Sequence, residues 1–219
     1  MLVATLDELL LKGLKEIFMK RRHRLFRVFK VCVLAITGGI IFLCAHVFGL
    51  DLLASTLPNV QVHLRLLDRL DRPEDGYCVD ILGTPGNLRI DVPLFAHNCK
   101  PTLTVDSAVV FTSDGFIKFP SVDRCLTVAG VNSSALPGAS ILLRKCNEMI
   151  PFFETIALQR FTHQKDGSLS VLGSKLCLTV GSQSAATYSP YHRWRTLFVE
   201  DCAKAEPVLS QWEFVVPRR

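Results

Sequence analysis

The sequence predicts an all-β domain made of three tandem repeats, preceded by an amphipathic helix and one transmembrane helix. Three observations support this prediction. Residues 31–50 form an uninterrupted apolar run. Beyond that run, six cysteines recur in pairs at a period of about 50 residues, which is typical of internal repeats. Short stretches of alternating hydrophobicity and frequent turn signals surround each pair, with little helical periodicity, so the repeated part is expected to be all-β.

Residues 1–30 form a basic segment. They contain eight of the 25 lysines and arginines but three of the 20 acidic residues, so all of the net charge of +5 lies there. The neutral remainder lacks the basic face of a nucleic-acid-binding domain, and no nucleic acid is expected as a partner. Apolar residues recur at helical spacing, and Thr5 with Glu8 forms a capping box. We expect an amphipathic helix on the cytoplasmic membrane surface. Alternatively, the basic residues 20–24 bind anionic lipid or an acidic partner.

The apolar run at residues 31–50 is long enough to span a membrane. Twenty residues at about 1.5 Å each cover roughly 30 Å, the thickness of a hydrocarbon core. The run and its leader are longer than in a secretory signal peptide, which favours an uncleaved anchor over cleavage near Ala54 and Ser55. The basic flank predicts a single-pass type II protein with a cytoplasmic N-terminus. The C-terminal domain would then be extracytoplasmic: periplasmic, lumenal or extracellular.

The eight cysteines divide into two groups. Cys32 and Cys44 lie inside the anchor, where thiols behave as small apolar groups. The others are Cys78, Cys99, Cys125, Cys146, Cys177 and Cys202. Of the 15 possible connectivities we expect pairing within each repeat, where each bridge closes a loop of roughly twenty residues and contributes about 3 kcal/mol. Three pairs of free buried thiols are the alternative. Disulfides require an oxidising compartment, which agrees with an extracytoplasmic domain.

Each repeat contains two recognisable strands. The first cysteine of each pair opens one, at residues 78–81, 125–128 and 177–180. The second cysteine closes another, at residues 94–99, 141–146 and 197–202. Apolar residues five and three positions before each closing cysteine should face the core: Leu94, Ala96, Ile141, Leu143, Leu197 and Val199. Asp-Gly at 114–115 and 166–167 predicts hairpin turns. Residues 51–59 form a linker, and strands at 62–66 and 212–216 mark a domain at 60–217.

This arrangement resembles the ricin-B-type β-trefoil of the R-type lectin family. Repeats of that family combine a cysteine-headed strand, a cysteine-closed strand and a Gln-x-Trp element. The third element is degenerate here, as Ser107-Ala108-Val109, Gln159-Arg160-Phe161 and Ser210-Gln211-Trp212. The resemblance covers roughly residues 60–217 and implies a β-trefoil of three disulfide-containing repeats.

The resemblance also implies where a sugar would bind. Lectins of this family hold a galactose-type sugar with a carboxylate that accepts hydrogen bonds from its hydroxyls and an aromatic ring against its apolar face. The first repeat has Asp80 and His97 at these positions, and Asp106 at a further polar position. Thr127 and Thr179 replace the carboxylate in the other repeats, which are expected not to bind. In the alternative interpretation, Asp80 caps a turn and His97 is solvated.

No enzymatic signature is present. The sequence has no Ser-His-Asp pattern, phosphate-binding loop or metal-binding spacing, so we expect no enzyme, cofactor or metal site. The remaining histidines, His63, His163 and His192, are expected on the surface.

The leading hypothesis is a membrane-anchored, lectin-like binding module that recognises a glycan or a protein surface. The alternative is an accessory structural subunit of a larger membrane complex. In that case integral membrane subunits are its partners, and the trefoil binds no sugar.

Overall fold

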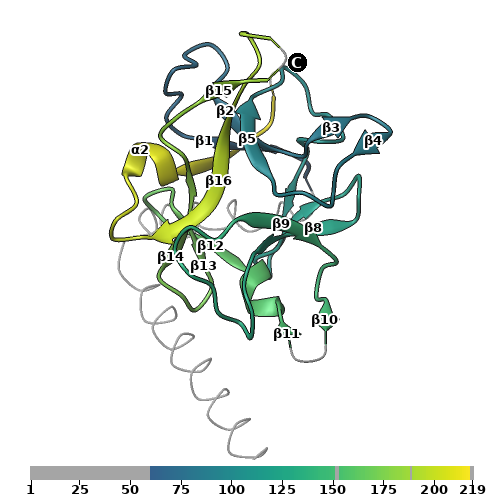
Figure 1. Cartoon of the computed structure of the whole chain (residues 1–219), viewed down its shortest axis with the longest axis vertical. Coiled ribbons are helices and arrows are strands. Elements are labelled where there is room, and N and C mark those ends of the chain that lie inside the picture. The colour runs from purple at the N-terminus through teal and green to yellow at the C-terminus, as the bar shows by residue number, and fades with distance from the viewer. Residues whose placement is uncertain (1–59, 151–152, 188, 218–219) are drawn as a thin grey trace, which may run out of the picture. The chain divides into compact units, whose positions relative to one another are not determined.

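The computed structural model describes residues 60–150, 153–187 and 189–217 (Figure 1). The segments predicted at 1–30, 31–50 and 51–59 lie outside the described residues. Across the part of the chain that is described, no helix is long and apolar enough to span a membrane.

Nearly all regular structure in the described residues is β-sheet (Figure 1). The strands are β1 (His63–Leu66), β2 (Tyr77–Asp80), β3 (Gly83–Thr84), β4 (Asn87–Leu88), β5 (Phe95–Asn98), β6 (Val110–Phe111), β7 (Ile117–Phe119), β8 (Arg124–Val128), β9 (Ile141–Arg144), β10 (Met149–Ile150), β11 (Phe153–Glu154), β12 (Phe161–His163), β13 (Leu169–Val171), β14 (Leu176–Val180), β15 (Ala185–Ala186), β16 (Arg193–Asp201) and β17 (Trp212–Val215). Two single-turn helices, η1 (Ile156–Gln159) and α2 (Pro207–Ser210), precede β12 and β17.

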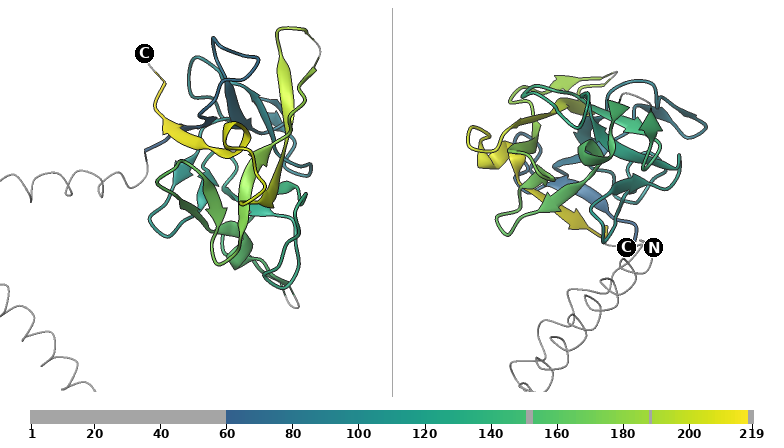
Figure 2. Two further views of the ribbon diagram at one scale, coloured as in Figure 1. Left: turned by 90° about the vertical axis from the view of Figure 1, so that its left-hand side faces the viewer. Right: turned by 90° about the horizontal axis from the view of Figure 1, so that it is seen from below.

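Three four-stranded antiparallel units make up the fold. Repeat 2 runs β6-β7-β8-β9 and repeat 3 runs β12-β13-β14-β16, whereas repeat 1 runs β17-β1-β2-β5. Repeat 1 therefore takes its first strand from the other end of the domain. Residue Leu66 of β1 pairs with Trp212 of β17, and Figure 2 shows the yellow C-terminal strand beside the blue N-terminal one. Three such units form a β-trefoil, and the all-β fold predicted from the sequence is confirmed.

The core contains the apolar residues that the alternating pattern of the strands predicts to face inward. All six apolar residues before the closing cysteines are buried, with exposed fractions between 0% and 7%. Trp212, which begins the last strand, is 1% exposed. Burial of large apolar side chains is the main favourable contribution to folding, so these positions fix which face of each strand turns inward.

The predicted bridges and hairpin turns are present. Disulfides join Cys78 to Cys99, Cys125 to Cys146, and Cys177 to Cys202, with Cα–Cα distances of 4.9, 5.0 and 5.0 Å. Gly115 lies in the β6–β7 turn with φ +90°, and Gly167 lies in the β12–β13 turn with φ +90°. A Cβ at Gly115 would approach the carbonyl oxygen of Phe161 to 2.8 Å, so glycine is required there for both conformation and space.

Repeats 1 and 3 are joined into one continuous sheet. Strand β16 is long enough to pair with β14 of its own repeat and with β5 of repeat 1. In the second pairing Thr196 lies opposite Phe95, and Trp194 lies opposite His97. The outer face of β2, β5 and β16 consequently combines residues that are distant in the sequence, and it carries the candidate site.

Candidate functional site

The first repeat brings together the three residues expected at its sugar position. Asp80 lies at the end of β2, His97 lies on β5, and Asp106 follows in the next loop. The Nζ atom of Lys100 lies 2.9 Å from Oδ2 of Asp80 and 2.5 Å from Oδ2 of Asp106. Nδ1 of His97 lies 3.8 Å from Oδ2 of Asp80. The expected residues are therefore adjacent, and Lys100 links the two carboxylates.

Sequence reasoning missed Lys100. It directly follows Cys99, and the Cys78–Cys99 bridge holds that point of the chain against β2. Its position directly after a closing cysteine could have indicated that Lys100 lies near β2. The spacing of the cysteines does not reveal which carboxylates its side chain contacts. The hydroxyl of Thr104 donates a 2.5 Å hydrogen bond to Oδ1 of Asp106 and fixes the second carboxylate.

Burial sets the protonation behaviour of this cluster. Asp80 is 3% exposed, and burial raises its pKa to about 7 against the opposing effect of Lys100. Burial acts in the same direction on Asp106, but hydrogen bonds from Lys100 and Thr104 outweigh it and lower the pKa of that carboxyl. Burial acts to lower the pKa of Lys100, but the charge of Asp80 and hydrogen bonds to both carboxylates raise it. Near neutral pH, Asp80 is thus the group whose charge changes most readily.

Oxygen Oδ1 of Asp80 has a vacant acceptor position. This atom is buried, and no described residue makes a well-aligned hydrogen bond to it, although the backbone N–H of Ile81 lies close enough to the carboxyl to act against the rise in its pKa. An unsatisfied carboxylate oxygen costs free energy, so a donor that reaches it gains a strong, charge-assisted hydrogen bond. Asp80 lies at the end of β2 and its Oδ2 accepts a hydrogen bond from Lys100, whereas the alternative interpretation predicts that it caps a turn.

His97 is buried rather than solvated, and His63 is buried as well, which corrects the surface expectation for these two histidines; His163 and His192 are exposed as expected. It is 9% exposed, and burial together with Lys100 and His192 lowers its pKa to about 4. Its ring stacks on that of His192, with centroids 5.6 Å apart and planes at 29°. His63 is also buried, at 4% exposure, and its Nε2 lies 3.2 Å from Oγ of Ser107. The ring of His97 lies against His192 of the β15–β16 connection, and that of His63 contacts Ser107 of the β5–β6 connection. Both partners are distant in the sequence, so local sequence does not reveal the burial.

Aromatic residues continue from His97 along the same face of the sheet. Asp80 lies opposite Phe95, and Cys78 lies opposite His97. Because alternate residues of a strand share a face, these side chains all project to one side, together with Trp194 of β16. The ring centroid of Phe95 lies 5.9 Å from that of His97 and 6.3 Å from that of Trp194, both edge to face.

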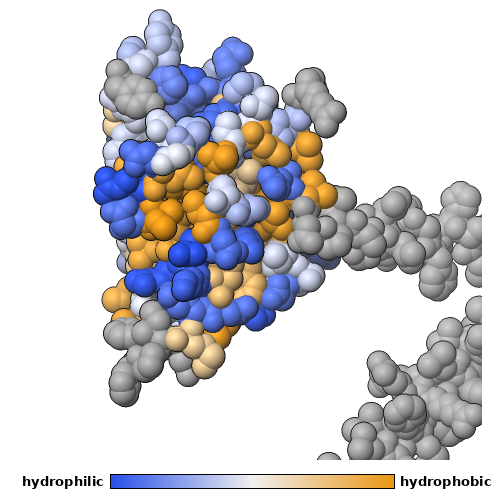
Figure 3. Space-filling model, turned by 90° about the vertical axis from the view of Figure 1, so that its right-hand side faces the viewer, coloured by the Kyte–Doolittle hydropathy of each residue, from blue (hydrophilic) through white to orange (hydrophobic). Residues whose placement is uncertain are grey.

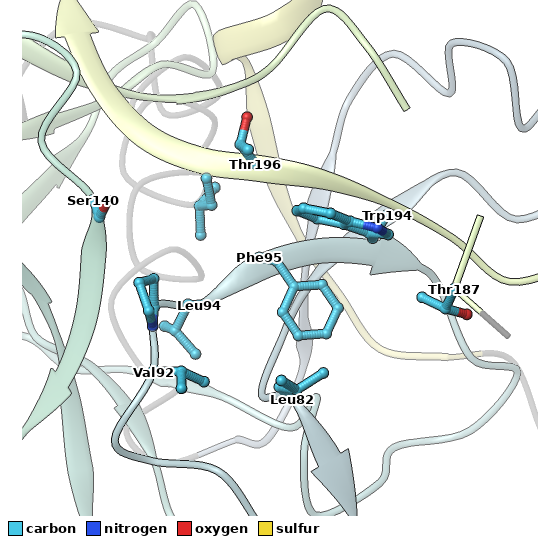
Figure 4. Close-up of a pocket in the computed structure, with 10 residues that line it drawn as sticks. Leu82, Val92, Leu94, Phe95, Ser140, Thr187, Trp194 and Thr196 are labelled. Carbon is cyan, nitrogen blue, oxygen red and sulfur yellow. The ribbon is translucent and has the colours of Figure 1, made fainter. Parts of the chain in front are cut away.

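An apolar pocket with a volume of about 420 Å³ adjoins these rings (Figure 4). Its lining residues come from the start of β5, from β16 and from four connecting segments: Leu82, Val92, Pro93, Leu94, Phe95, Ser140, Thr187, Trp194, Thr196 and Leu197. Figure 4 shows the rings of Phe95 and Trp194 side by side, with Leu82 beneath the phenyl ring. Figure 3 shows apolar side chains gathered in a band across the middle of the face seen from the β3–β4 side.

The equivalent positions in repeats 2 and 3 are satisfied internally. The hydroxyls of Thr127 and Thr179 donate to carbonyl oxygens two residues earlier, at 3.0 Å in each case. Gln159 is fully buried, and its Nε2 donates to Thr127 and to the carbonyl oxygen of Lys145. Gln159, the Gln of the degenerate Gln-x-Trp element, therefore links η1 to repeat 2 by hydrogen bonds. Among the described residues, no group of three or more His, Cys, Asp and Glu is placed to hold a metal.

No protein-family model and no curated protein sequence matches this chain. Solved structures do resemble it. The agglutinin from Abrus precatorius is 20% identical over 74% of this chain, with a TM-score of 0.49; the match covers 51% of the agglutinin chain, so this chain spans about half of it. The β-trefoil lectin of the Vibrio vulnificus hemolysin/cytolysin, solved with N-acetyl-D-lactosamine bound, is 15% identical over 73% of this chain and 96% of its own, with a TM-score of 0.45.

The solution structure of the mdaA-1 domain is 12% identical over 74% of this chain and 93% of its own, with a TM-score of 0.50. At these identities the likeness concerns the fold. The β-trefoil assignment itself rests on the strand order and on the three equivalent four-stranded units of this chain.

Proposed function

We propose that this domain is a lectin-like binding module that holds a sugar at the first-repeat site. The observation that carries the proposal is the buried Asp80–Lys100–Asp106 cluster, with its vacant carboxylate oxygen beside a row of aromatic rings. Sugar hydroxyls both donate and accept hydrogen bonds, and the cluster offers both functions. Oδ1 of Asp80 is covered in the structure, so a sugar hydroxyl would donate to it only after the side chains that cover it move aside. The ammonium of Lys100, whose side chain is 26% exposed, is the accessible donor to another hydroxyl.

Aromatic contacts complete such a site. The C–H face of a pyranose ring is apolar and packs against aromatic rings. His97 occupies the stacking position, and His192 lies against it. Because its pKa is about 4, the imidazole of His97 is neutral at pH 7. His97 is 9% exposed and His192 lies against it, so the exposed ring at this position is that of His192.

Replacing Asp80 with asparagine is expected to weaken binding of methyl β-D-galactoside at least about tenfold. A hydrogen bond to a charged acceptor contributes about 1.5–3 kcal/mol, which a neutral amide does not reproduce. Isothermal titration calorimetry on the full chain in lipid nanodiscs measures the change. Thr179→Ala is the matched control, because Thr179 holds the equivalent position in the third repeat. Its affinity should equal that of the wild type.

Lowering the pH provides a second measure of the same carboxylate. The pKa of Asp80 is about 7, so binding to the wild type should weaken between pH 8 and pH 6 as the carboxylate becomes protonated. Nearby His97, with a pKa of about 4, does not titrate in this window. The Asp80→Asn variant should show no such dependence. Sugar binding that is unaffected by both the substitution and the pH change would place the sugar elsewhere.

The apolar run at 31–50 would tether this module to a membrane, with residues 1–30 in the cytoplasm. The three disulfides of the domain support an extracytoplasmic position, because such bridges persist in oxidising compartments. A protease applied to the extracytoplasmic side of sealed membranes should digest the domain and spare residues 1–30. Digestion of those residues instead, with an intact domain, would show the opposite orientation.

A second candidate is the accessory structural subunit of a membrane complex. The observation that favours it is the ion pairing itself, since Lys100 already satisfies one oxygen of each carboxylate. This candidate predicts that the wild-type protein does not bind galactosides, and the titration described above decides between the two.

A further inference from the structure

We propose that the ligand is a glycoside with an uncharged, apolar aglycone: the sugar occupies the first-repeat site, and the aglycone occupies the pocket beside Phe95 and Trp194. This inference rests on the proposed function and specifies the ligand class. The sugar would contact repeat 1, to which Asp80 belongs, and the aglycone would contact both repeat 1 and repeat 3, to which Phe95 and Trp194 respectively belong.

The polar cluster and the pocket are neighbours on one face of the sheet, with Phe95 between them. Asp80 lies directly opposite Phe95 across the β2–β5 pair, and Phe95 lines the pocket. Along β5, His97 and Phe95 are two residues apart and have rings in edge contact at 5.9 Å. An aglycone attached to a sugar beside Asp80 and His97 would therefore extend along this face and contact first the phenyl ring of Phe95 and then the indole of Trp194. The centroids of these two rings are 6.3 Å apart.

The lining determines the chemistry of the aglycone. None of the ten described lining residues carries a charge, and the polar groups of their side chains are the hydroxyls of Ser140, Thr187 and Thr196 and the indole N–H of Trp194. Neither a carboxylate nor an amide is available there to bind a second polyhydroxylated ring. The volume of about 420 Å³ lies within the range of small-ligand pockets. An uncharged alkyl or aryl group fits this lining.

The pocket is open to solvent. Leu82 at its rim is 45% exposed, and Phe95 and Trp194 are half-buried. The lining is a concave apolar surface in contact with water. Binding of an apolar ligand is favourable because it removes this surface from water. Leu94 and Leu197, which are 3% exposed, form a rigid part of the lining because they also belong to the core.

Three galactosides test the inference on the full chain in lipid nanodiscs. Methyl β-D-galactoside fills the sugar site alone, whereas butyl and phenyl β-D-galactoside add an alkyl or an aryl group. We expect the better of the latter two to bind about tenfold more tightly than the methyl compound, which corresponds to burial of roughly two methylene groups. A larger gain for butyl indicates a lipid-like aglycone, and a larger gain for phenyl indicates an aromatic one.

Variants locate the added group. Leu82→Asp places a charge at the rim of the pocket and should abolish the gain of the butyl and phenyl compounds over the methyl compound. Ile90→Asp is the matched control, because Ile90 is a similarly exposed apolar residue at 39% that does not line the pocket. It should keep the full gain. Trp194→Ala should reduce the gain as Leu82→Asp does. Quenching of Trp194 fluorescence by p-nitrophenyl β-D-galactoside gives an independent measure, since the other of the two tryptophans, Trp212, is buried.

The outcomes separate this inference from the proposed function. Binding of all three galactosides with equal affinity, lost in Asp80→Asn, would overturn the aglycone site and leave the sugar site standing. A gain that persists in both Leu82→Asp and Trp194→Ala would also overturn it, because the apolar group would then lie elsewhere. Failure of every galactoside to bind would refute the proposed function, and the inference with it.

Discussion

The Trp212→Ala variant is expected to lose about 3–5 kcal/mol of unfolding free energy, the range measured when large aromatic side chains are removed from cores. Trp212 is 1% exposed, and its Nε1 donates a 2.9 Å hydrogen bond to the carbonyl oxygen of Leu178. The indole therefore connects β17, the first strand of repeat 1, with β14 of repeat 3. Alanine leaves a cavity and an unsatisfied carbonyl oxygen at this junction.

Guanidinium chloride unfolding, followed by far-UV circular dichroism, measures this loss. Trp194→Ala is the matched control because it removes the same side chain from a half-buried position, and it should cost much less. A loss below about 1 kcal/mol for Trp212→Ala would show that the core relaxes around the cavity and that the indole contributes little to joining β17 to repeat 3.

Removal of single disulfides is expected to separate stability from binding. The Cys78–Cys99 and Cys125–Cys146 bridges have the same sequence separation of 21 residues. By chain entropy, each contributes about 3 kcal/mol. We therefore expect the paired alanine variants of either bridge to lose similar stability, measured by the same denaturant titration.

Galactoside binding should differ between the two variants. Cys99 precedes Lys100, and its bridge to β2 holds the ammonium against Asp80. Loss of that bridge should abolish measurable binding, while loss of Cys125–Cys146, whose residues lie in repeat 2, should preserve it. Equal loss of binding in both would mean that the site responds to overall stability and not to the position of Lys100.

Much of the fold was predictable from local sequence. The cysteine spacing and the alternation around it located the strands that contain Cys78, Cys125 and Cys177, the inward face of each closing strand, and the three bridges. Alternation is a property of neighbouring residues, and the repeats supplied three copies of the same pattern. The short hairpins β3–β4 and β10–β11 have no counterpart in that pattern and were not predicted.

The candidate site was only partly predictable. Family resemblance identified Asp80, His97 and Asp106, and the structure places them together. The burial of His97, the contact of Lys100 with two carboxylates, and the contribution of Trp194 were missed. Each depends on pairing between segments far apart in the chain, and the β5–β16 pairing in particular joins the first repeat to the third.

The sequence by itself determined the repeat number, the bridge partners and the side of each strand that faces the core, because short-range periodicity and cysteine spacing encode them. The tertiary structure alone decided that β17 completes repeat 1, that Lys100 occupies the space between two buried carboxylates, and that an uncharged pocket adjoins them. Those features arise from packing between repeats. The free energy of such contacts depends on which distant side chains meet, and no local pattern records that.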